Sequence, residues 1–92
     1  MRIIDSIPHE SMTISIFQMN DKYQVRFEAG PMEQIFKFLV EEVKSVENLK
    51  TKIDAAFIEA TRKRFNEMFM QMRAIELWSF ITIRAAVQVA QV

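Results

Sequence analysis

The chain has 92 residues, half of them hydrophobic, with twelve basic and twelve acidic side chains and no cysteine. The balanced charge gives no overall field that would attract nucleic acid or an anionic membrane, and the lack of cysteine excludes disulfides and thiolate metal sites. We expect one small domain. Asp5 comes too early for a signal peptide and no charge-free apolar run is long enough to span a membrane, so we expect a cytoplasmic protein with no membrane partner.

Residues 12–29 predict an antiparallel β-hairpin. Apolar and polar residues alternate on both sides of Asn20-Asp21, and these two residue types tolerate the backbone of a two-residue hairpin turn. Such a turn pairs Met19 with Lys22 and brings the large apolar residues of both strands to one face. These residues are Ile14, Ile16, Val25 and Phe27.

The opposite face of this hairpin carries two apolar residues, Phe17 and Met19, among polar neighbours. Since a sheet residue either packs against a second layer or meets solvent, these two side chains are covered or form a contact patch. We treat them as candidate interaction residues.

The rest of the chain predicts helices. Gly30 is the only glycine and Pro31 the last proline, so residues 32–92 contain neither of the usual helix breakers. Apolar residues spaced three and four apart predict an amphipathic helix over 31–46, although 35–40 is also rich in strand-forming residues. Capping residue types at 45–48 indicate a joint, and a longer helix is predicted over 48–78.

The segment 80–91 fits either a strand or a helix. Its alternation of apolar and other residues, with several β-branched side chains, favours a third strand that would complete the sheet. The predicted fold is therefore α+β. It is one domain over 1–92, with an N-terminal antiparallel hairpin packed on two antiparallel helices and a C-terminal apolar segment.

The predicted long helix is apolar on two sides. Phe69 lies about 100° and Met70 and Leu77 about 180–200° from the main apolar stripe. A helix that is apolar on two sides is buried on two sides, and flexible methionines suit an adaptable contact surface. We therefore expect a non-enzymatic protein–protein interaction or scaffold module acting as a homodimer, with these three residues at the seam or against another protein partner.

The basic residues Arg62, Lys63, Arg64 and Arg73 are the alternative site, for a nucleic-acid-binding accessory protein. The first three span about 200° of a helix and have acidic neighbours, so a solvated helix surface is the better interpretation, and we do not expect nucleic acid as the partner.

Chemistry-bearing residues form no recognisable motif. His9 has Asp5 and Glu10 nearby, but Pro8 prevents the helical spacing that would bring three ligands together. No nucleophile elbow, phosphate-binding loop or calcium loop is present in the sequence. We expect no cofactor, no metal and no enzymatic activity; an enzyme subunit with a site shared across an interface is the remaining possibility.

Overall fold

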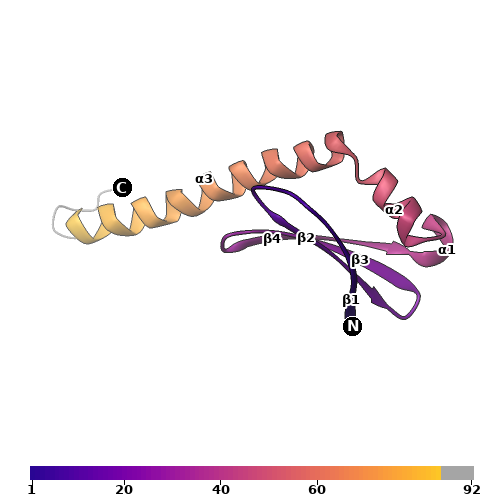
Figure 1. The fold of residues 1–92 in the computed structure, drawn as a ribbon. Helices are drawn as coiled ribbons and strands as arrows, with labels where there is room; N and C mark the ends of the chain where they lie inside the picture. Colours follow the sequence, from indigo (N-terminus) through magenta and orange to yellow (C-terminus); the bar gives the residue numbers. More distant parts are fainter. Residues whose placement is uncertain (86–92) are drawn as a thin grey trace.

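The computed structural model describes the backbone of residues 1–85 and the side chains of residues 1–75. Within these residues, four strands form an antiparallel sheet in chain order, and three helices follow them (Figure 1). The strands are β1 (Arg2–Ile7), β2 (Thr13–Met19), β3 (Lys22–Ala29) and β4 (Met32–Leu39). The helices are α1 (Val40–Val43), α2 (Val46–Lys52) and α3 (Ala55–Ala85). The α+β class is confirmed.

The predicted hairpin forms β2 and β3 in the expected register. Met19 pairs with Lys22, Ile16 with Val25, and the intervening Asn20 has a φ of 53°. This left-handed conformation costs little for asparagine, because its short side chain can bond locally. The two-residue turn therefore directs the large apolar side chains of both strands to a single face, which is buried.

The prediction of a helix over 31–46 is wrong, because most of that segment is the strand β4. Met32, Phe36 and Phe38 lie in alternate positions, facing the same side as their β3 partners. Two residues break the alternation that would have revealed the strand: Gln34 faces inward and Ile35 faces outward. The helical residues of this segment are the four of α1 and Val46, the first residue of α2.

A further strand, β1, was not predicted. It pairs with β2 along one edge of the sheet, and its register shifts between Ile3 and Asp5. The shift puts Ile3 opposite Phe17 but Asp5 opposite Ile16, so the two ends of β1 follow different alternation phases. This bulge explains why period-two analysis does not identify the segment.

The joint predicted at 45–48 is confirmed at Ser45, whereas residues 46–48 form the first turn of α2. Ser45 caps α2 by accepting a hydrogen bond from the Asn48 amide at 3.1 Å. The long helix does not run unbroken over 48–78, because the chain stops at Ile53 and restarts after Asp54, which accepts a bond from the Phe57 amide at 2.9 Å.

The C-terminal segment 80–91 lies partly in α3. Residues 80–85 continue this helix, so the described part of the segment is not the third strand that we predicted. Residues 86–91 lie outside the described residues.

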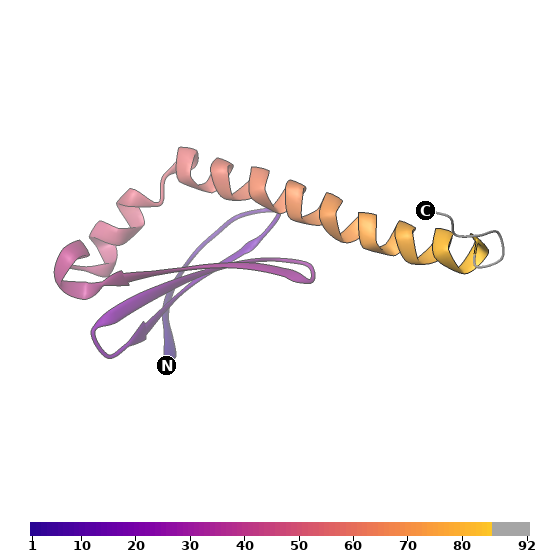
Figure 2. The same ribbon diagram turned by 180° about the vertical axis from the view of Figure 1, so that it is seen from behind.

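The core lies between one face of the sheet and the helices α2 and α3 (Figure 2). Phe27 is at its centre, with its ring centroid 5.8 Å from that of Phe36 and 5.9 Å from that of Phe57. Leu49 of α2, Phe65 of α3 and Ile53, which caps the end of α2, complete the core.

Helix α3 is far longer than the sheet that it covers (Figure 1). Its 31 residues extend about 46 Å at 1.5 Å per residue, whereas a strand of eight residues extends about 27 Å. The described molecule is accordingly elongated, measuring 59 × 26 × 18 Å. The second half of α3 projects beyond the sheet.

Candidate functional site: the overhang of α3

One face of α3 packs on the sheet along its first half. We call the residues of this face the core stripe: Phe57, Thr61, Phe65 and Met68. Thr61 is fully buried, and its main-chain carbonyl also accepts a hydrogen bond from the Gln34 side chain of β4 at 2.9 Å. These contacts fix how far along α3 the sheet reaches.

The core stripe continues past the end of the sheet. At 100° per residue, Met72 and Ile75 fall within the same 80° sector as the core stripe. Yet Ile75 is 65% exposed, whereas Phe65 is 4% exposed. The residue types are equally apolar, so the difference arises because no sheet lies beneath the later turns.

We call residues 69–85 of α3 the overhang. Phe69 lies on one flank of the continued stripe and is 46% exposed, and Met70 lies on the opposite side of the helix and is 67% exposed. Both predicted contact residues are therefore exposed large apolar side chains. Leu77, the third, belongs to α3, but its side chain lies outside those described.

A shallow hollow of about 280 Å³ marks the place where α3 leaves the sheet. It lies between the middle of the helix and the sheet end formed by the β1–β2 loop and the β3–β4 turn. Its lining is mixed, apolar and polar: Ser11, Met12, Ala29, Met32, Arg62, Phe65, Asn66 and Phe69. The hollow thus adjoins the first residue of the overhang.

The candidate patch on the other face of the sheet is not an exposed apolar pair. Phe17 is only 8% exposed, and the Arg26 guanidinium carbon lies 4.5 Å above its ring centroid. Met19 is half-buried. The prediction that Phe17 offers a contact surface is therefore wrong, since a neighbouring strand's arginine covers the ring. Exposed apolar side chains on this face belong instead to Ile3 and Ile35.

The basic residues of α3 do not form one cationic surface. Arg62 makes two hydrogen bonds to the Glu59 carboxylate, one of them from Nε at 2.9 Å; this contact raises the pKa of Arg62 and lowers the pKa of Glu59. Arg64 donates to Gln34 Oε1 at 3.4 Å, and the guanidinium of Arg73 lies 5.8 Å from the Phe69 ring centroid. Lys63 is exposed.

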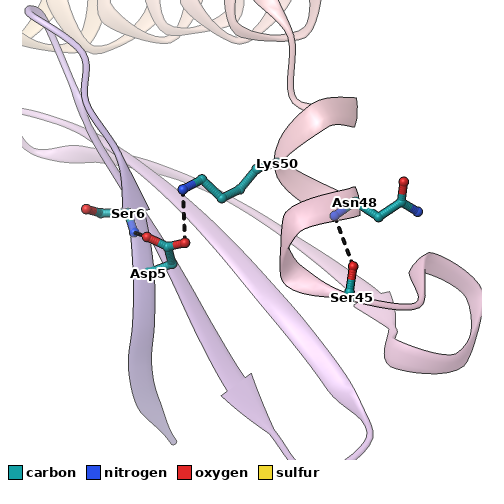
Figure 3. A network of polar contacts seen from close by, with 5 residues as sticks. All are labelled: Asp5, Ser6, Ser45, Asn48 and Lys50. Carbon is teal, nitrogen blue, oxygen red and sulfur yellow. Dashed lines mark hydrogen bonds and ion pairs between the residues drawn. The ribbon is translucent and has the colours of Figure 1, made fainter.

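The polar residues near the N-terminus form structural contacts. Asp5 Oδ2 accepts a hydrogen bond from Lys50 Nζ at 3.0 Å, which ties the edge strand β1 to α2 (Figure 3). This bond, together with one from the Ser6 amide, lowers the pKa of Asp5. His9 Nδ1 accepts from the Ser11 amide at 3.1 Å. Among the described residues, no three potential metal ligands lie close together.

Met72 and Ile75 were missed as candidate contact residues. Both lie on the main apolar stripe of the long helix, whereas the contact residues were predicted among the apolar side chains outside that stripe. A length comparison could have identified them, because a helix of 31 residues extends several turns beyond strands of seven or eight residues.

Comparison with known proteins adds no relative. The chain matches no protein-family model, no curated protein and no solved structure. Within the described part of the chain, no helix is long and apolar enough to cross a membrane.

Proposed function

We propose that this chain is a non-enzymatic protein–protein interaction module that acts as a homodimer, with the overhang of α3 as its contact surface. One observation carries the proposal: the core stripe continues as exposed apolar side chains where the helix leaves its sheet. Contiguous apolar surface of this kind on a small protein marks an interaction site.

Burial of the overhang would contribute substantially to stability. Full burial of one large apolar side chain is worth about 1.5–3 kcal/mol, so covering Phe69, Met72 and Ile75 would contribute several kcal/mol. Small domains have a total stability of only about 5–15 kcal/mol. A partner that covers these side chains would therefore stabilise both the fold and the assembly.

Nucleic-acid binding through the basic residues has less support. Three of the four arginine and lysine side chains concerned contact a carboxylate, an amide or an aromatic ring of the same chain. A protein that neutralises phosphates needs such side chains available and clustered. We therefore place the contact surface on the apolar overhang rather than on these charges.

Sedimentation velocity across a wide concentration series tests the proposal. We expect a mass of two chains at high concentration and a shift toward one chain on dilution. Because association stabilises the folded chain by mass action, the melting temperature should also rise with protein concentration. A single-chain mass at the highest concentration, with a melting temperature independent of concentration, would contradict the homodimer.

A further inference from the structure

We infer that the two chains of the proposed homodimer pair through their α3 helices in antiparallel orientation, so that each overhang covers the core-stripe continuation of the other. This inference rests on the proposed function and specifies its geometry. Three properties of the overhang carry it: the face that is apolar, the space occupied by the sheet, and the length of the helix that remains.

The face is set by the core stripe. Met72 and Ile75 point to the side of α3 that the sheet covers along the first half of the helix, and among the described residues no layer buries Ile75 on this side. Met70 lies about 180° from the centre of the stripe. A second layer that continues where the sheet ends would bury Met72 and Ile75 and leave Met70 in solvent.

The direction is set by the sheet. In a two-fold parallel pair joined through this stripe, the first halves of the two helices would also face each other. Each first half would then occupy the space that the sheet of the other chain already fills. In an antiparallel pair, each helix approaches from beyond the end of the other and stops where the other sheet begins. Only the antiparallel pair lets both stripes face each other without a clash.

The extent of overlap is set by area. The overhang has 17 residues, so it is about 26 Å long and about 10–12 Å wide, which gives a projected face of roughly 300 Å². A stable interface buries about 800 Å² per partner, which is more than the projected face of the overhang. Because the available face is small, the seam must use its full length. Full overlap brings the helix end near Ala85 of one chain beside Phe69 and the hollow of the other, which adds contact area.

A second copy of this chain suits the surface electrostatically. The overhang carries only Arg73, Glu76 and Arg84, a net charge of +1. Two such segments meet without strong like-charge repulsion, whereas the first part of α3, residues 55–68, carries five charges in fourteen residues. An isologous contact uses the same face of both chains, as this pairing does.

The face is tested with two matched substitutions on the same helix. Ile75→Glu and Met70→Glu alter side chains that are 65% and 67% exposed, so neither change disturbs the core of the single chain. We expect Ile75→Glu to raise the dimer dissociation constant roughly tenfold or more, as at an interface hot spot, and Met70→Glu to leave it unchanged. Circular dichroism at low concentration checks that both variants stay folded.

The direction is tested by disulfide cross-linking. Because the chain has no native cysteine, only the introduced cysteines can form disulfides. In the full antiparallel overlap, residue pairs whose numbers sum to about 154 lie opposite one another, so a mixture of Met72→Cys and Thr82→Cys chains should form mixed disulfides. Met72→Cys chains alone should not, because their two cysteines lie about ten residues apart along the seam, or about 15 Å. Efficient disulfide formation by Met72→Cys alone would indicate a parallel pair and overturn the inference.

The outcomes separate this inference from the proposed function. A wild-type chain that stays monomeric refutes both. A wild-type dimer that resists Ile75→Glu, or that Met70→Glu dissociates equally well, leaves the homodimer standing and refutes the pairing through the continued stripe. A dimer with the expected sensitivity and the expected mixed disulfides supports both.

Discussion

Gln34 of β4 donates a hydrogen bond from its side-chain amide to the main-chain carbonyl of Thr61 in α3, 2.9 Å away. The other end of the same amide accepts from Arg64 at 3.4 Å. Gln34 occupies an inward position of β4, between the apolar residues Met32 and Phe36. This polar contact therefore fixes the position of α3 along the sheet, and with it the residue at which the overhang begins.

Gln34→Ala should lower the free energy of unfolding by about 1 kcal/mol, the usual net value of a hydrogen bond that joins two elements. Urea denaturation measures the change. Glu33→Ala, one residue earlier on the exposed side of the same strand, serves as the control and should change the free energy by less than about 0.5 kcal/mol. Equal effects of the two substitutions would show that the Gln34 contact does not stabilise the fold.

Phe27→Ala should lower the free energy of unfolding by about 3–5 kcal/mol, because the ring is fully buried between Phe36 and Phe57 and its loss leaves a cavity. This is much of the total stability that a small domain has, so a large unfolded fraction is expected by calorimetry. Ile35→Ala, an exposed position on the other face of the sheet, should leave the melting temperature nearly unchanged. A melting temperature of Phe27→Ala close to that of the native chain would contradict the assignment of this ring to the centre of the core.

The features that were predicted correctly from the sequence are those that depend on neighbours in the chain. The β2–β3 hairpin follows from alternation and from a turn at Asn20 and Asp21, and all of these are local. The strand β4 was mistaken for a helix because the polar Gln34 faces the core and the apolar Ile35 faces away from it, so the alternation expected of a strand is interrupted. The reason for an inward glutamine is its bond to Thr61, 27 residues later, which no local pattern contains.

The same distinction applies to the candidate site. The position of Met70 away from the main apolar stripe follows from its angle on the helix, which the sequence alone defines, and its side chain is 67% exposed. The exposure of Ile75 depends on where the sheet ends, and Phe17 is covered because Arg26 of the neighbouring strand lies over it. Both are tertiary relationships between separate elements, so the residue pattern within one element does not reveal them.

Lys44→Gly should stabilise the protein by about 1 kcal/mol, because relief of about 1–3 kcal/mol of backbone strain exceeds the entropic cost of glycine, about 0.5–1 kcal/mol. Lys44 has a φ of 77° and a ψ of −51°, and the Ser45 amide donates to the Val43 carbonyl at 2.9 Å across it. This is a γ-turn of the strained kind, which glycine adopts without steric cost. Chemical denaturation measures the gain.

The control for this substitution is Lys44→Ala, which removes the same side chain but keeps the strain of a Cβ at positive φ. It should leave the stability close to that of the native chain. If alanine stabilised as much as glycine, the gain would arise from loss of the lysine charge, and the backbone explanation would be wrong.

The ion pair between Asp5 and Lys50 should make stability depend on pH in the acid range. The hydrogen bond from Lys50 lowers the pKa of Asp5 in the folded chain, so the pair stabilises the fold above the pKa of the unfolded aspartate. This contribution is lost as the pH falls through the lowered pKa of the folded state. Because both side chains are about one-third exposed, the contribution is small and should weaken with added salt.

A double-mutant cycle isolates this contribution from other acidic groups. Asp5→Asn, Lys50→Gln and the double variant are unfolded with urea near neutral pH and again at a pH below the lowered pKa of Asp5. We expect a favourable coupling energy between the two residues at neutral pH and none in acid, since a protonated Asp5 carries no charge for Lys50 to pair with. A coupling energy that is the same at both pH values would mean that the two side chains interact by packing alone and that β1 is not held to α2 by charge.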